Sequence, residues 1–160
     1  MNVDLVLETL GRNQVDFLLI GGMNFLLRHK PVLTFDIDVW VNDTQINLDR
    51  CELAMIDLDA SWGATEETWR PVKEQTGWTR RQSVFCLVSP HASVDVFRTV
   101  AGLASWAECK ARAYQGKTKS GVEFFGLSDA DMVACQLALP SGTRKYSRIE
   151  ALRKAMGEIS

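Results

Sequence analysis

The stretch from Phe17 to Val41 constrains the fold more than any other part of the chain. It begins with a short apolar run, of the length expected for a buried strand, which ends at the pair Gly21-Gly22. Residues with helical apolar spacing follow, and a second apolar run then carries Asp36 and Asp38. The pattern predicts a strand, a glycine turn, a short helix and a second strand. The two acids of that second strand share one face, because residues i and i+2 of a strand point the same way.

Two neighbouring carboxylates on an apolar strand are costly, because like charges raise each other's pKa and burial disfavours the ionised form. A bound cation removes that cost, and Mg²⁺ usually combines one or two protein carboxylates with substrate phosphates. Asp95 is a third acid of this kind, isolated in the alternating run over 93–100. Three such carboxylates could together hold two divalent ions. The Gly21-Gly22 turn would let a phosphate approach backbone N–H groups at the start of a helix.

The remaining pattern predicts a mixed α/β (α+β) domain with a small sheet flanked by helices. At 160 residues we expect a single domain overall, with a core over 1–127 and C-terminal helices over 128–160 packed on it. Segment 61–79 is expected to be irregular or partly stranded. Helices are expected over 3–10, 23–29, 45–59, 105–114, 129–139 and 144–156, and strands over 15–20, 33–41, 83–88, 93–100 and 122–125.

Composition excludes several classes of protein. Lys plus Arg number 18 against 20 Asp plus Glu, so the chain lacks the basic excess expected of a general nucleic-acid binder. The four cysteines form no C-x-x-C pair, and we expect reduced, mostly buried thiols rather than a zinc site. No apolar run approaches the roughly 20 residues that a membrane span needs. We therefore expect a cytoplasmic protein without a membrane partner.

Gly21-Gly22, the pair Asp36-x-Asp38 and the later Asp95 resemble the signature of the DNA polymerase beta-like nucleotidyltransferase superfamily. The resemblance is closest to its small bacterial members, the minimal nucleotidyltransferases and the toxin-type enzymes of abortive-infection and toxin–antitoxin systems, and the segment 127–134 extends it. It implies that Asp36, Asp38 and Asp95 are the catalytic residues and bind a pair of Mg²⁺ ions, with Asp95 also the base. It further implies that Gly21 and Gly22 hold the triphosphate of an NTP such as ATP.

The implied reaction moves an NMP group from an NTP to a hydroxyl of a protein, an RNA or a small molecule, with pyrophosphate leaving. An antitoxin or a second copy of the chain is the further partner that the resemblance implies. The chain departs from the family pattern where Val32 replaces an Arg, Gln136 replaces a Lys, and Lys145 and Arg148 replace acids. These departures favour an alternative, a catalytically silent member of the fold that binds nucleotide or acts as an interaction module.

Other interpretations of the same residues stay open. Thr34 is a candidate binding residue that orients a carboxylate through its hydroxyl, although a plain strand threonine fits equally well. A haloacid dehalogenase-like phosphatase also has an Asp-x-Asp after an apolar strand, but it needs Thr or Val where this chain has Trp40. A D-x-D glycosyltransferase would need a longer chain. Asp57-x-Asp59 follows a helical stripe and is expected to be a solvated helix end.

Overall fold

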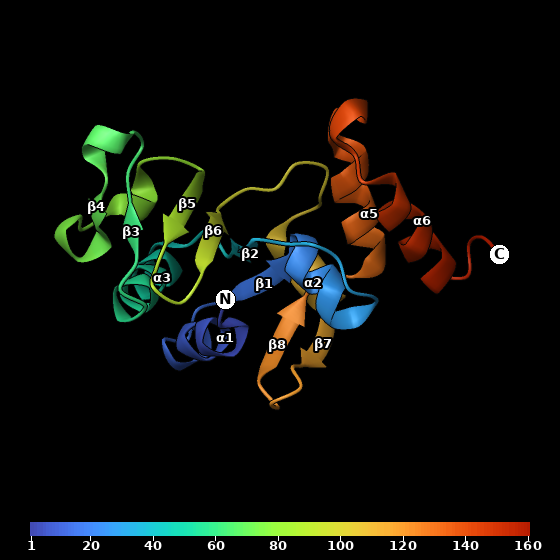
Figure 1. The fold of residues 1–160 in the computed structure, drawn as a ribbon, viewed down its shortest axis with the longest axis horizontal. Helices are drawn as coiled ribbons and strands as arrows, with labels where there is room; N and C mark the ends of the chain where they lie inside the picture. The colour runs from blue at the N-terminus through green and yellow to red at the C-terminus, as the bar shows by residue number, and fades with distance from the viewer.

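A computed structural model describes residues 1–160 and places eight strands in one sheet with helices packed against it (Figure 1). The strands are β1 (Phe17–Ile20), β2 (Asp36–Val41), β3 (Ser61–Trp62), β4 (Arg70–Pro71), β5 (Val84–Val88), β6 (Ser93–Phe97), β7 (Tyr114–Lys117) and β8 (Glu123–Gly126). The helices are α1 (Val3–Arg12), α2 (Gly21–Arg28), α3 (Gln45–Asp57), α4 (Trp106–Ala111), α5 (Asp129–Ala138) and α6 (Tyr146–Ala155). Short 3₁₀ turns are η1 (Glu66–Thr68), η2 (Val72–Glu74), η3 (Trp78–Arg80) and η4 (Ser141–Thr143).

The sheet is mixed, and its strand order is β4-β3-β5-β6-β2-β1-β8-β7. Most neighbours are antiparallel, including those of the β5–β6 and β7–β8 hairpins. The pairs β2–β6 and β1–β8 are parallel. Because β6 lies beside β2, two segments that are far apart in the sequence meet at the centre of the sheet.

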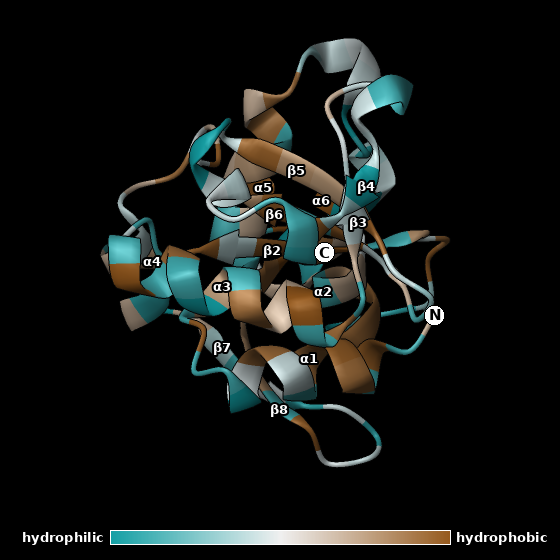
Figure 2. Cartoon of the chain, turned by 90° about the vertical axis from the view of Figure 1, so that its left-hand side faces the viewer, coloured by the Kyte–Doolittle hydropathy of each residue, from teal (hydrophilic) through white to brown (hydrophobic).

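Side chains alternate between the two faces of the sheet and form two hydrophobic clusters. Ile37 and Val39 of β2 belong to the larger cluster, which also contains residues of α1 and α3. Trp40 belongs to the smaller cluster, together with residues of α2, α5 and α6. Figure 2 shows α1 and α3 in front of the sheet, with hydrophilic residues among those turned outward. The alternation therefore places Asp36 and Asp38 on the face of α5 and α6.

The predicted helices and strands are present with differences at their ends, and β7 is a strand outside the predicted strand ranges. Helix α1 continues through Gly11 to Arg12, so its predicted end at residue 10 was wrong; Gln14, with a φ of 57°, takes the left-handed conformation beyond the helix. The strand predicted over 33–41 begins only at Asp36, and the preceding Leu33 and Phe35 are exposed in a loop. The helix predicted over 105–114 ends at Ala111.

Two predicted helix starts are confirmed by their capping hydrogen bonds. The Thr44 hydroxyl accepts from the N–H of Asn47 (3.4 Å), and the Ser128 hydroxyl accepts from the N–H of Asp131 (3.1 Å). The carboxylate of Asp131 does not complete a reciprocal capping box. It accepts two hydrogen bonds from Arg112, at 2.9 and 2.8 Å, and so ties α5 to the end of α4.

The four cysteines are free. Cys51 and Cys109 are buried and Cys135 is half-buried, in keeping with the expectation of mostly buried thiols, whereas Cys86 is exposed. Helices of the length and apolar character that a bilayer crossing demands do not occur in the structure.

Candidate active site

Asp36, Asp38 and Asp95 converge, as the family resemblance implies. Parallel pairing of β2 with β6 sets Asp38 directly opposite Asp95, and Asp36 lies two residues earlier on the same face of β2. One oxygen from each carboxylate can be chosen so that all three lie within 4.8 Å of one another. The residues that alternate with them, such as Ile37 and Val94, anchor both strands in the larger cluster. The packing of one face of the sheet thus fixes the acids on the other.

Burial and neighbouring carboxylates disfavour the ionised forms of Asp38 and Asp95. Burial raises the pKa of Asp38 to about 7, with further contributions from Asp36 and Asp95, and the positive charge of Arg148 acts in the opposite direction. Burial and the charge of Asp36 also raise the pKa of Asp95, which a hydrogen bond from the Cys86 thiol partly offsets. A divalent ion with a preference for oxygen ligands would relieve this repulsion. The donor set therefore fits Mg²⁺.

The glycine pair forms the first turn of α2 directly beside Asp38. Gly21 has a φ of +66°, and a Cβ at that position would overlap the Oδ2 atom of Asp38. A Cβ on Gly22 would lie 2.8 Å from the Thr34 hydroxyl oxygen. No side chain caps this end of α2, so its first N–H groups and the positive end of its dipole are available to an anion. The turn therefore has no room for larger side chains at Gly21 and Gly22, and its free N–H groups can bind a phosphate.

Thr34 does not orient a carboxylate. Its hydroxyl donates to the backbone carbonyl of Asp36 (3.3 Å) and lies against Gly22. The predicted hydroxyl–carboxylate contact was wrong because β2 begins at Asp36, so Thr34 lies in the loop where strand alternation no longer sets side-chain direction. Thr34 instead holds the loop against the glycine turn. The second pair, Asp57 and Asp59, is exposed at the end of α3, as predicted.

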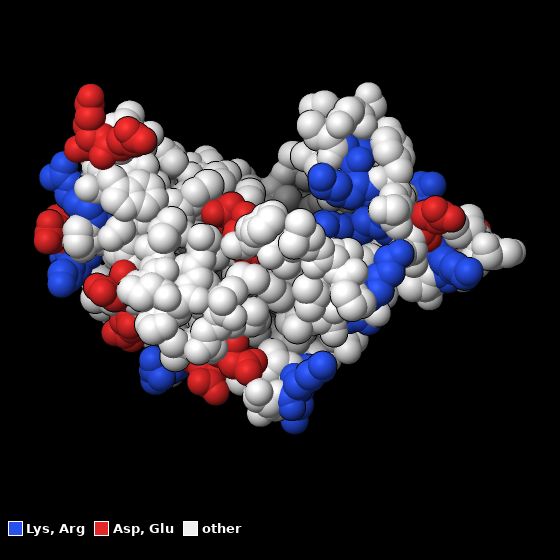
Figure 3. Space-filling view, in the orientation of Figure 1, with Lys and Arg blue, Asp and Glu red and all other residues white.

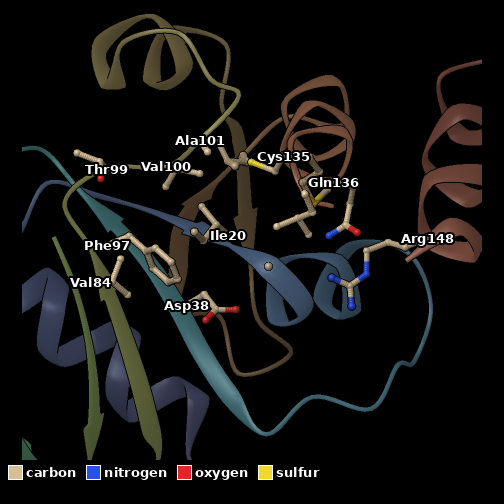
Figure 4. A pocket seen from close by; sticks show the side chains of 14 residues that line it. Ile20, Asp38, Val84, Phe97, Thr99, Val100, Ala101, Cys135, Gln136 and Arg148 are labelled. Atoms are coloured by element: carbon tan, nitrogen blue, oxygen red, sulfur yellow. The ribbon is translucent and has the colours of Figure 1, made fainter. Parts of the chain in front are cut away.

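A cavity of about 430 Å³ opens beside Asp38 and Gly21 (Figure 4). Its wall is mostly apolar, with Phe97 from the end of β6 and Met132 from α5, and two polar side chains, Gln136 and Arg148, close its far side. In Figure 3 the surface is hollowed at this place, with acidic side chains over β2 and β6 and basic side chains over α5 and α6. A ligand with a charged part and an apolar part suits such a cavity.

Two side chains at the site were not predicted. Cys86 lies opposite Asp95 in the β5–β6 pair. Although the residue as a whole is exposed, partial desolvation of its thiol together with the neighbouring acids raises the thiol pKa to about 11. Arg148 reaches the cavity from α6, whereas the sequence marked it only as a departure from a family pattern. No local sequence signal identifies either residue, because their positions depend on strand register and on the docking of α6.

Comparison with solved structures identifies the fold. The crystal structure of the lincosamide antibiotic adenylyltransferase LnuA, with lincomycin bound, superposes with a TM-score of 0.63 at 12% sequence identity, covering 96% of this chain and 96% of that one. The solution structure of the antibiotic-resistance factor ANT(2'')-Ia gives a TM-score of 0.57 at 12% identity, covering 99% of this chain and 82% of that one. No protein-family model and no curated protein matches the sequence. The chain therefore has the nucleotidyltransferase fold, which confirms the predicted fold class.

Proposed function

We propose that this protein is a Mg²⁺-dependent nucleotidyltransferase that moves an NMP group from an NTP to a hydroxyl of an acceptor. The observation that carries the proposal is the triad of Asp36, Asp38 and Asp95, within 4.8 Å of one another and beside a glycine turn at a helix start. The fold shared with LnuA supports the same reaction class. Bound Mg²⁺ would be held by these three carboxylates, and it would neutralise charge on the phosphates and activate the attacking oxygen.

The chain's own residues would divide the work between binding and proton transfer. The N–H groups at the start of α2, beside Gly21 and Gly22, would bind phosphate oxygens. Asp95, whose pKa is raised, would accept the proton of the incoming hydroxyl. The apolar wall of the cavity, including Phe97 and Met132, would exclude water from the reacting groups and so limit hydrolysis of the NTP.

Among the acceptor classes, a protein, an RNA or a small molecule, we propose the small molecule. The 430 Å³ cavity beside the triad supports this choice, because its size and its mostly apolar wall are those of a small-molecule site. The neighbour LnuA is an adenylyltransferase of lincosamide antibiotics with lincomycin bound, which offers a precedent on this fold. We also propose a cytoplasmic location, which the four free cysteines support.

Isothermal titration with each NTP, with and without Mg²⁺, tests the site directly. We expect binding that requires the metal and that is lost in both Asp36→Ala and Asp95→Ala, while Asp59→Ala, an exposed acid outside the triad, binds as the unmodified protein does. Incubation of the protein with α-labelled NTP and pools of hydroxylated compounds then reveals the acceptor as a labelled product. Absence of NTP binding by the unmodified protein, with or without metal, would refute the proposed function.

A catalytically silent protein of the same fold is the second candidate, and one observation favours it. Gln136 makes a structural contact, because its Oε1 accepts a hydrogen bond from the N–H of Lys145 (2.8 Å) at the start of α6. Nucleotide binding without any metal-dependent turnover, across all NTPs and acceptor pools, would favour this candidate. Retention of all three costly acids argues for the enzyme, since a silent site gains stability by losing them.

A further inference from the structure

Arg148 differs from every other arginine of the chain, because its side chain makes no hydrogen bond or ion pair with the protein. All the other arginines have at least one such partner in the structure. The Nε of Arg148 is also buried without a hydrogen-bond acceptor. An arginine stays charged under these conditions, and a desolvated donor without an acceptor is costly. An anionic ligand that reaches this guanidinium would recover that cost.

The position of Arg148 shows where such an anion would bind. Its Nη2 lies 3.5 Å from the position that a Cβ on Gly22 would take, so the guanidinium faces the start of α2. The Cζ of Arg148 lies 5.4 Å from the centroid of the Phe25 ring, a cation–π contact. Figure 4 shows the guanidinium directed across the cavity toward the side on which Asp38 lies. The positive end of a helix and a free guanidinium therefore face the same space.

Arg148 lines two cavities. One is the 430 Å³ cavity that contains Asp38 and Gly21. The other, of about 210 Å³, is lined by Lys30 and Lys145 as well as Arg148. A chain of phosphates that starts at the carboxylates and passes Arg148 would meet successive positive charges. A single phosphate at the carboxylates would not extend to them.

We propose that Arg148 binds the β- and γ-phosphates of the NTP and makes the site selective for triphosphates over diphosphates and monophosphates. This inference rests on the proposed function. In the transfer step the acceptor oxygen forms a bond to the α-phosphorus, and the bond from that phosphorus to the αβ-bridging oxygen breaks. The electron pair of the broken bond leaves with pyrophosphate, and the hydroxyl proton passes to Asp95. Arg148 stabilises the negative charge that accumulates on the departing pyrophosphate.

The test compares the affinities of NTP, NDP and NMP, each with Mg²⁺, by isothermal titration. We expect the unmodified protein to bind NTP most tightly. Arg148→Gln should weaken NTP binding by about 10- to 100-fold, since hydrogen bonds to charged groups are lost, and leave NMP binding unchanged. Arg148→Lys should recover part of the loss, because it restores the charge without the planar guanidinium. Arg153→Gln is the matched control, as an exposed arginine of the same helix that pairs with Glu158 at 3.8 Å.

The outcomes separate this inference from the proposed function. Equal weakening of NTP, NDP and NMP, or no weakening of any, would overturn the role of Arg148 and leave the nucleotidyltransferase proposal standing. If the unmodified protein binds no nucleotide, inorganic tripolyphosphate serves as the second probe. Tripolyphosphate binding that Arg148→Gln removes would sustain the anion site while the proposed reaction fails, and no binding at all would overturn both. Thermal unfolding of each variant verifies that it is folded.

Discussion

Replacement of Asp38 by Asn should stabilise the metal-free protein at neutral and alkaline pH. Asn has nearly the shape of a protonated Asp, so the substitution removes the charge and leaves the packing in place. In the folded state burial and the two neighbouring acids raise the pKa of Asp38 from the ordinary 3.8 to about 7. The folded protein therefore holds a proton at this site between about pH 4 and 7 that the unfolded chain has already released. The stability of the unmodified protein consequently falls as the pH rises through that window.

The size of the effect follows from the two pKa values. A difference of one pKa unit corresponds to about 1.4 kcal/mol, so the difference between the folded and unfolded pKa values of Asp38 can change the free energy of unfolding by at most about 4 kcal/mol. Because the carboxyl lines an open cavity, solvent screening reduces this, and we expect Asp38→Asn to raise the free energy of unfolding by about 1–2 kcal/mol at pH 8. Near pH 4 the substitution should change it little, because the carboxyl is then protonated in the folded protein.

Urea unfolding in the presence of EDTA, at intervals from pH 4 to pH 8, measures this prediction. Asp59→Asn is the control, since Asp59 is exposed outside the triad and has a φ of 53° that Asn also tolerates. Addition of Mg²⁺ at pH 8 should stabilise the unmodified protein more than Asp38→Asn, and so reduce the difference between their free energies of unfolding. A variant that is less stable than the unmodified protein at pH 8, or a difference that does not change with pH, would refute the electrostatic account of the triad.

Three further predictions concern the surroundings of the site. Gly21→Ala should lower the free energy of unfolding by about 1–3 kcal/mol and abolish NTP binding, because the new Cβ would overlap Asp38 and φ at this position is positive. Gly11→Ala in α1 is the control; its Cβ would meet no atom within 4 Å, so it should be neutral or stabilising in the same urea titration. Equal effects of the two substitutions would contradict the steric argument. Asp131→Ala should lower the free energy of unfolding by about 1–3 kcal/mol, since it removes the two hydrogen bonds that Arg112 donates to Asp131. An unchanged melting temperature in thermal unfolding would show that this contact between α4 and α5 does not stabilise the protein. Iodoacetamide should alkylate Cys86 several-fold faster at pH 8 in Asp95→Asn than in the unmodified protein, because loss of the Asp95 charge lowers the thiol pKa from about 11. Mass spectrometry measures the rate of alkylation, and an unchanged rate would show that the charge of Asp95 does not control the thiol.

Much of the site could be predicted from local sequence because the controlling geometry is local. Asp36 and Asp38 share a face wherever an alternating strand carries them, and a glycine pair between a strand and a helix indicates a turn with an open helix start. The convergence of Asp95 with them depends on β6 lying parallel to β2 in one particular register. The spacing of residues within either strand does not contain that information, and the family resemblance supplied it.

Two errors have local causes, whereas the missed role of Arg148 has a tertiary one. The first helix was expected to end at residue 10, before Gly11, but it continues to Arg12 and the left-handed position falls on Gln14. Thr34 was assigned to a strand that begins two residues later. Arg148 reaches the cavity because Ile149 and Leu152 dock α6 in the smaller hydrophobic cluster, and such tertiary docking leaves no mark on the sequence around the arginine.

The parallel pairing of β2 with β6 also has a kinetic consequence. Before Asp38 and Asp95 can meet, the chain must close the long connection that contains α3, β3, β4 and β5, and closing such a loop costs entropy before any contact compensates it. The repulsion within the triad should therefore arise late, after the main barrier to folding. If so, relief of that repulsion will slow unfolding and leave the rate of folding nearly unchanged. A bound metal ion would then lengthen the lifetime of the folded protein by slowing its unfolding, without accelerating its folding.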